Sequence, residues 1–351
     1  MDKFIGLDVH AVSTTVVVTT QSGKRISKHV VETSGQALVE LLKTIPGSKH
    51  VILEEGTQSS WLHEILSPHA AEVVVIAVTE RRKGNKDDER DALALAEKLR
   101  VGAVKHQVYK GEGTFKALRH LSRTYAMVVG DVVRVKNRLK SLYRSRGIPT
   151  EGTALYAEND RTQWVAMLPE TTWSAALTLF AEHDAMAKIR DQAEAELLAE
   201  ARKYPTTRLL QTCPGLGPIR AAQLIAVVMS PARFRTKRQF WSYCGLGIVM
   251  RSSADWARDK NGNWSRQQVA QTCGLNRNYN HLLKSIFKGA ANTVVTKLKE
   301  SDLHQGYARQ LAAGTKPNLA KLTLARKIAA IALAVWKSGE NYDSTNNRKQ
   351  R

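Results

Sequence analysis

The sequence has little cysteine and no long hydrophobic run, and each shortage excludes a class of protein. Its three cysteines, Cys213, Cys244 and Cys273, form no Cys-x-x-Cys pair, so neither a zinc site nor a disulfide framework is indicated. We expect buried or inert thiols in a reducing cytoplasm. The longest apolar stretches, such as residues 328–336, are too short to span a bilayer. Asp2-Lys3 leads directly into a short strand and not into a signal peptide.

Acidic residues are also scarce relative to basic ones. The 351 residues include 53 Lys and Arg but only 32 Asp and Glu, which gives a formal charge of +21. An excess of this size predicts a polyanionic partner, most simply DNA or RNA. A merely solubilising charge is the alternative.

The carboxylates that are present include four in informative places. Asp8 and Glu54 each end a short apolar run, and Asp88 and Asp91 stand where an apolar helix begins. Carboxylates at two strand ends and a helix start can converge on one spot of an α/β sheet. In a basic chain, such a cluster can hold divalent metal against a nucleic-acid phosphate.

Other interpretations of these acids stay open. The residues around Asp88 also fit a solvated acidic turn that complements the helix dipole, and Glu55 competes with Glu54 for the inward position. Arg81, Arg82 and Lys83, just before the acidic turn, favour a loop that handles phosphate.

The first domain, residues 1–108, is predicted to be α/β. Hydrophobic patterning predicts strands and helices in the order strand 3–9, strand 13–20, strand 28–32, helix 35–44, strand 51–54, helix 60–66 and strand 72–77. A three-stranded meander followed by helix, strand, helix and strand is the order of a ribonuclease-H-like sheet.

Residues 109–205 are predicted to be a long helical segment. A narrow apolar seam with alternating spacings of three and four consists of Leu118, Leu121, Tyr125, Val128, Val132, Val135, Leu139 and Leu142. A second helix is expected at residues 172–203. The pair predicts an antiparallel hairpin or an intermolecular coiled coil, and an ordinary bundle is the alternative. We favour a role in dimerisation because the seam is narrow.

Residues 206–340 are predicted to be a second, mostly helical domain, and residues 341–351 a basic disordered tail. Gly215 and Gly217 form a turn before a helix at 219–229, which is similar to a phosphate-binding helix-hairpin-helix; a plain helix-loop-helix is the alternative. Arg235, Lys237 and Arg238 are interleaved with aromatic residues, a mixture that suits backbone contact and base stacking.

Together these motifs resemble a known family. They are Ile5-Gly6-Leu7-Asp8-Val9, Leu53-Glu54, residues 86–92, Pro214-Gly215-Leu216-Gly217 and residues 240–246. The chain resembles, over nearly its whole length, the DEDD-type transposases of the insertion-sequence-110 group, which are bridge-RNA-guided recombinases of bacterial mobile elements.

The resemblance implies a RuvC-like first domain and a C-terminal transposase domain. The implied tetrad, which would hold Mg²⁺ or alternatively Mn²⁺, is Asp8, Glu54, Asp88 and Asp91. The implied nucleophile is Ser253, by its distance from Gly245-Leu246, with Ser252 as the close rival. In this family the serine is understood to form a covalent 5′-phosphoserine link with DNA. Arg251 and Arg258 flank the serines and would neutralise the phosphate.

The resemblance also implies partners. They are donor and target DNA, a structured guide RNA, and further copies of the chain in a dimer that assembles to a tetramer, all near the nucleoid of a bacterial cytoplasm. No membrane partner is expected. The sequence reads Glu54-Glu55-Gly56-Thr57 where many members read Glu-x-Thr-Gly, which leaves the choice of glutamate open. Two rival functions remain: a hydrolytic nuclease of the Holliday-junction-resolvase kind, and a non-enzymatic nucleic-acid-binding protein.

Overall fold

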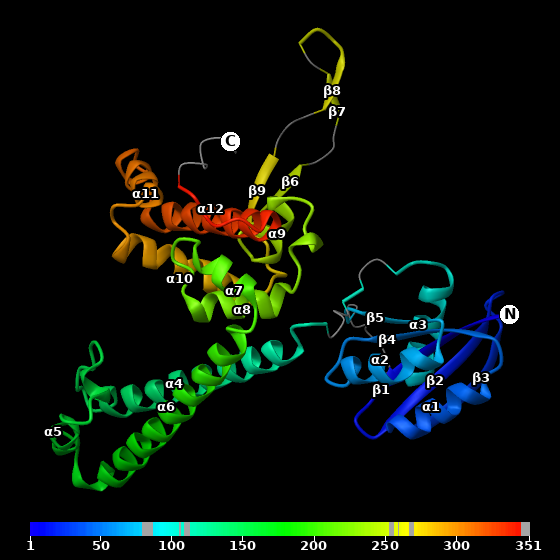
Figure 1. Ribbon diagram of the computed structural model, residues 1–351, viewed down its shortest axis with the longest axis horizontal. Coiled ribbons are helices and arrows are strands. Elements are labelled where there is room, and N and C mark those ends of the chain that lie inside the picture. The colour runs from blue at the N-terminus through cyan, green and yellow to red at the C-terminus, as the bar shows by residue number, and fades with distance from the viewer. Residues whose placement is uncertain are drawn as a thin grey trace. The chain divides into compact units, whose positions relative to one another are not determined.

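The chain folds into two compact units, residues 1–113 and 114–351, each with its own core (Figure 1). The structure is a computed structural model that describes residues 1–78, 87–104, 107–108, 113–252, 256–258, 260–266 and 270–344. The second unit contains both the long helical segment and the C-terminal helical region.

The first unit is built on a mixed five-stranded sheet in the order β3-β2-β1-β4-β5. Its strands are β1 (Asp2–Val9), β2 (Ser13–Thr20), β3 (Arg25–Glu32), β4 (Ser48–Glu54) and β5 (Glu72–Ile76). The first three pair antiparallel, and β4 and β5 run parallel to β1. This arrangement is consistent with the predicted ribonuclease-H-like α/β fold, and the predicted element order is confirmed.

Helices cover the two faces of this sheet. On one face, Leu7 of β1 and Leu53 of β4 pack with α1 (Gly35–Thr44) and α2 (Ser59–Leu66), which is followed by the short η1 (Ser67–His69). On the other face, Ile52 of β4 packs against Leu95 of α3 (Asp88–Arg100). Since neighbouring residues of a strand point to opposite faces, Gly6, Asp8 and Glu54 belong to the face covered by α3.

Gly6 allows α3 to lie close to β1. A Cβ atom at this position would be 1.9 Å from the carbonyl oxygen of Ala92 in α3. The helix begins just before this contact because the Asp87 side chain accepts hydrogen bonds from the backbone N–H groups of Glu89 and Arg90. The close approach and the cap together fix where Asp88, the first helical residue, lies above the sheet.

The second unit opens with two long helices, α4 (Lys116–Arg144) and α6 (Trp173–Ala201), that pack along each other. Tyr125 donates a hydrogen bond to Glu194, and Arg138 pairs with Glu182. Because an early residue of α4 meets a late residue of α6, the pair is an antiparallel hairpin within one chain (Figure 1). Its far end carries η2 (Ala154–Tyr156), α5 (Arg161–Ala166) and η3 (Glu170–Thr172).

The rest of the second unit is mostly helical, as predicted. Its helices are α7 (Pro205–Gln211), α8 (Pro218–Val228), η4 (Pro231–Arg233), α9 (Lys237–Tyr243), α10 (His281–Lys297), α11 (Asp302–Ala312) and α12 (Pro317–Ser338). Four strands that were not predicted lie between α9 and α10: β6 (Ile248–Ser252) pairs with β9 (Ala270–Leu275), and β7 (Trp256–Arg258) with β8 (Trp264–Arg266). Among the described residues, no helix is long and apolar enough to cross a membrane.

Candidate metal centre

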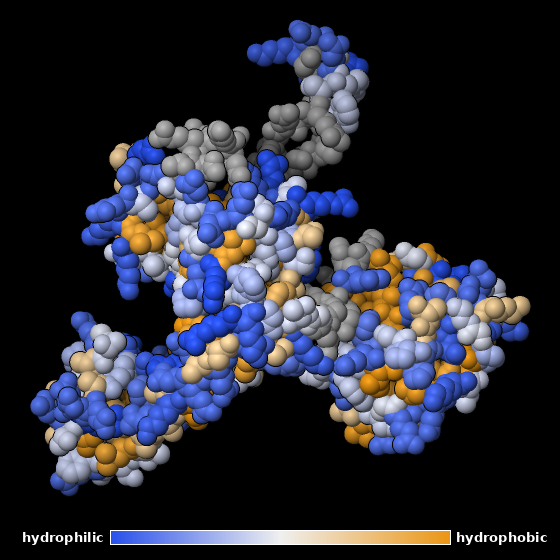
Figure 2. Space-filling model, viewed as in Figure 1, coloured by the Kyte–Doolittle hydropathy of each residue, from blue (hydrophilic) through white to orange (hydrophobic). Residues whose placement is uncertain are grey.

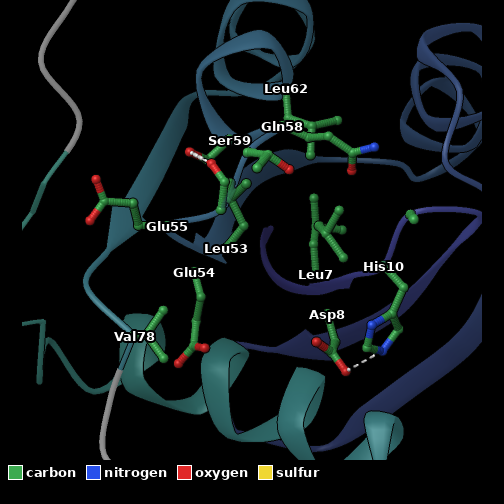
Figure 3. A pocket seen from close by; sticks show the side chains of 14 residues that line it. Leu7, Asp8, His10, Leu53, Glu54, Glu55, Gln58, Ser59, Leu62 and Val78 are labelled. Atoms are coloured by element: carbon green, nitrogen blue, oxygen red, sulfur yellow. Dashed lines mark hydrogen bonds and ion pairs between the residues drawn. The ribbon is translucent and has the colours of Figure 1, made fainter. Parts of the chain in front are cut away.

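Asp8 and Glu54 come together at one edge of the sheet. In the parallel pair of β1 and β4, Leu7 lies opposite Leu53, so the two following carboxylates stand at the same level on the α3 face. Figure 3 shows both side chains pointing towards α3, whereas Glu55 points away. Glu54 is half-buried and Glu55 is exposed.

His10 and Asp88 complete a close cluster with Asp8. The His10 Nε2 atom lies 3.3 Å from a carboxylate oxygen of Asp8 and 3.3 Å from one of Asp88. One potential ligand atom from each of the three residues lies within 4.8 Å of the others. His10 was not among the residues predicted from the sequence: it lies just beyond the end of β1, and its position two residues after Asp8 was its one signal in the sequence.

Asp91 occupies a different row of α3 from Asp88. It lies one helical turn before Leu95, which packs on the β4 and β5 side of the sheet, whereas Asp88 lies one turn before Ala92, which packs on β1. Asp91 is exposed. The close three-residue set therefore contains Asp8 and Asp88 of the predicted tetrad, and Glu54 and Asp91 stand outside it.

The donor set fits a divalent cation. Ligand oxygens of one Mg²⁺ lie about 2.0–2.1 Å from the ion, so donors within 4.8 Å of one another need little adjustment to share it. The side chains of Asp8, His10 and Asp88 are 21%, 34% and 43% exposed, which leaves room for water or phosphate oxygens as further ligands. A cavity of about 240 Å³ adjoins them and is lined by Asp8, His10, Glu54, Glu55 and Ser59, among others (Figure 3).

The predicted serine region lies in the second unit. Ser252 is the last residue of β6 and pairs in register with Ala270, and Arg251 pairs with Gln271. Ser253 lies outside the described residues, as do Arg81, Arg82 and Lys83. Arg258 is in β7, with its guanidinium 5.3 Å from the centre of the Trp264 ring.

The two glycines of the predicted phosphate turn have different surroundings. Gly215 has a left-handed φ of +77°, and a Cβ atom there would lie 2.4 Å from the carbonyl oxygen of Ala290 in α10. Its missing side chain is thus required by helix packing. Gly217 is the residue that precedes α8, and nothing lies within 4 Å of the place a Cβ would take.

The basic and aromatic residues that follow separate into surface and core. Arg235, Lys237 and Arg238 are exposed, whereas Phe234 and Phe240 are only 6% and 1% exposed. These two rings are therefore core residues and are not available for the base stacking that the mixture suggests. Trp256 and Trp264 of this region are large exposed aromatics, at 59% and 62%, and neither is among the residues predicted from the sequence.

Comparison with known proteins agrees with this architecture. Residues 5–145 match a family model described as a transposase, of the DEDD type of IS110, and residues 207–308 match one described as "Transposase IS116/IS110/IS902 family". Both matches identify a transposase, and the first of them is of the DEDD type. The chain belongs to the IS110 family of insertion-sequence transposases, which confirms the resemblance seen in the sequence.

A curated relative carries a consistent name. The protein of Sinorhizobium fredii (strain NBRC 101917 / NGR234) named "Putative transposase y4pF/y4sB" is 25% identical over 310 residues, which cover 83% of this chain and 72% of the relative. Membership of a transposase family implies DNA binding with DNA cleavage and transfer, and the DEDD type implies use of a divalent metal.

Proposed function

We propose that the chain is an RNA-guided, site-specific recombinase that moves its own insertion sequence through a phosphoserine intermediate. Asp8, Glu54, Asp88 and Asp91 hold the metal, and Ser253 is the nucleophile. The observation that carries the proposal is the meeting of Asp8, Glu54 and the start of α3 at one sheet edge. The chain matches IS110 family models over residues 5–145 and 207–308.

The metal in this proposal is Mg²⁺ or Mn²⁺. Bound there, it would neutralise phosphate charge and orient the oxygens of an in-line displacement. Carboxylates suit both ions, but His10 adds an imidazole nitrogen 3.3 Å from both Asp8 and Asp88. Since Mg²⁺ strongly prefers oxygen ligands, this nitrogen makes the site more accepting of Mn²⁺ than four carboxylates alone.

In the proposed step the Ser253 hydroxyl attacks the scissile phosphorus and loses its proton. The bond from phosphorus to the 3′ oxygen breaks, the DNA leaves with a free 3′ hydroxyl, and the 5′ phosphate stays on the serine. The later attack of another 3′ hydroxyl on this ester rejoins DNA without an external energy source. A serine hydroxyl is a weak nucleophile unless its surroundings activate it, and Arg251 and Arg258 are the nearby cations in sequence that offset the phosphate charge.

The guide RNA and the oligomer belong to the same proposal. The guide RNA rests on the likeness to the IS110 family, and the charge of +21 suits any polyanionic partner, DNA or RNA. The α4–α6 hairpin supports dimerisation, because Met167, Trp173 and Leu177 near its α5 end are 60%, 38% and 53% exposed. Figure 2 shows hydrophobic side chains among the hydrophilic ones at that end of the hairpin. Two dimers would then form a tetramer on DNA.

The test is to trap a covalent protein–DNA adduct. Purified full-length protein, the RNA transcribed from beside its gene, labelled junction DNA and Mn²⁺ are combined, and the denatured products are separated by electrophoresis. Wild type and Ser252→Ala should give an adduct that Ser253→Ala does not. Cleavage without any adduct would favour the hydrolytic nuclease instead, and an adduct that survives in Ser253→Ala but not in Ser252→Ala would move the nucleophile by one residue.

A further inference from the structure

Strands β7 and β8 form a hairpin (Figure 1). It carries two exposed tryptophans. Trp256 in β7 and Trp264 in β8 are 59% and 62% exposed, an unusual state for the largest side chain, which buries most of its surface in ordinary packing. Large exposed aromatics on a short two-stranded element contribute little to a core of their own and indicate a contact surface.

The strand register places both rings on one side of the hairpin. Trp256 lies opposite Arg266, and Arg258 lies opposite Trp264. Residues opposite each other in an antiparallel pair share a face, as do residues two apart along a strand. Trp256, Arg258 and Trp264 therefore belong to the same face, with the Arg258 guanidinium 5.3 Å from the centre of the Trp264 ring.

The hairpin is also positively charged. Residues 256–266 contain Arg258, Lys260 and Arg266 against the single acid Asp259, and Arg258 and Lys260 are exposed. Flat aromatic rings beside cations match the chemistry of unpaired nucleotides, whose bases stack on the rings while their phosphates pair with the cations. Fully paired DNA offers no free base faces to such rings.

The place of the hairpin in the chain identifies which nucleotides these are. It is inserted between the paired strands β6 and β9, and Ser252 is the last residue of β6. Two residues lie between Ser253 and Trp256, so their Cα atoms, three steps apart along the chain, are at most about 11 Å apart even in a fully extended chain. At about 3.4 Å per nucleotide along one strand, that is roughly three nucleotides of DNA.

We propose that Trp256 and Trp264 stack on unpaired DNA bases within a few nucleotides of the cleaved phosphate and so hold the duplex open there. The stacking surface follows from exposure and register alone, whereas its location beside the cleaved phosphate rests on the proposed role of Ser253. The occupant is DNA and not guide RNA, because the hairpin is tied by the chain to the nucleophile.

The first experiment measures binding without cleavage. Full-length protein with Ser253→Ala is titrated, without metal, into a fluorescent oligothymidylate of about twenty nucleotides, a paired duplex and the matching oligouridylate. Trp256→Ala and Trp264→Ala should each weaken binding of the oligothymidylate by about fivefold or more and binding of the duplex by less than twofold. Trp256→Phe, which keeps a ring, should retain most of the affinity. Trp61→Ala, which removes a 39% exposed tryptophan from the first unit, is the control.

Several results would overturn the stacking surface. Unchanged oligothymidylate binding in both alanine variants would refute it, as would an equal loss for duplex, which indicates only a charge or folding effect. A loss of affinity confined to the oligouridylate would mean that the tryptophan face binds RNA and not DNA. A change in sedimentation of the free protein with no change in DNA binding would make the face a contact with a second copy of the chain.

The second experiment tests the location. In the adduct assay, with Ser253 intact, Trp256→Ala should slow adduct formation on paired junction DNA by about fivefold or more. Three mismatched base pairs beside the cleavage position should restore the rate, since they remove the cost of opening. If wild type forms no adduct, the proposed function fails while the binding result stands; if the mismatches restore nothing, the location is wrong although the nucleophile is right.

Discussion

Replacement of Gly6 by alanine should separate Asp8 from Asp88 without touching either. The new Cβ would lie 1.9 Å from the Ala92 carbonyl oxygen and 2.8 Å from the Ala96 nitrogen. Both obstacles are backbone atoms of α3, so no side-chain rotation relieves the clash. The helix must move away by about 1 Å or more to reach ordinary contact distances, and Asp88 moves with it.

The cost follows from this geometry. Overpacking of a well-packed core costs about 1–3 kcal/mol, and backbone obstruction places Gly6→Ala near 3 kcal/mol. Hydrogen–deuterium exchange of the intact chain measures this loss of stability in β1 and α3. If their amides exchange when these elements open, a loss of about 3 kcal/mol should speed the exchange by roughly 100-fold. Affinity for Mn²⁺ should fall in the same variant, since donors now within 4.8 Å would be pulled beyond the reach of one ion.

Gly56→Ala is the matched control. Gly56 lines the same cavity, yet nothing lies within 4 Å of the place its Cβ would take. This variant should keep the exchange rates of β1 and α3. If Gly6→Ala left both the exchange rates and the Mn²⁺ affinity unaltered, the claim that packing of α3 on β1 positions Asp88 beside Asp8 would be refuted.

Two further outcomes are expected in the second unit. The Arg161 guanidinium, which donates two hydrogen bonds to Asp184, lowers the pKa of that carboxyl from its ordinary 3.8. The ion pair therefore stabilises the folded protein above pH 3.8, and this contribution is lost as the pH falls through the lowered pKa. Asp184→Asn should remove this pH-dependent part of the stability, which is worth at most about 1 kcal/mol. An unchanged dependence of the melting temperature on pH would contradict the pairing. Burial raises the pKa of the Cys213 thiol to about 12 and that of Cys244 as well, while Cys273 is exposed. A thiol reagent at pH 8 should therefore label one cysteine quickly in the native protein and none in Cys273→Ser, and rapid labelling of all three would be the contrary result.

The order of strands and helices along the first unit was predictable because most of its strands contain short apolar runs separated by clear turns. The choice between Glu54 and Glu55 was not, because β4 is buried on both faces. Val51, Ile52 and Leu53 are all 0% exposed, so the sequence shows no alternation that would indicate which of the two glutamates faces α3. Only the register of β4 against β1 resolves their directions.

Two other features, His10 and the β7–β8 hairpin, were not predicted from the sequence, for different reasons. His10 lies beyond the end of β1. It is far from Asp88 in the sequence, and only the packing of α3 on the sheet brings the two side chains together. The β7–β8 hairpin did leave a signal, since Asn261-Gly262 stands between its strands and Gly262 has a φ of +81°. Such a dipeptide between short β-prone runs is typical of a hairpin turn.

The central claim is that Asp8, Glu54, Asp88 and Asp91 bind a divalent cation, and Mn²⁺ titration of the intact, DNA-free protein tests it most directly. The site is open to solvent, so a carboxylate about 3 Å from a doubly charged ion contributes about 3 kcal/mol at a water-like dielectric constant, or about 100-fold in affinity. Calorimetry should show that loss for Asp8→Asn, a clear weakening for Glu54→Gln and none for Glu55→Gln. Wild-type affinity in Asp8→Asn, or a loss in Glu55→Gln that Glu54→Gln does not show, would contradict the account.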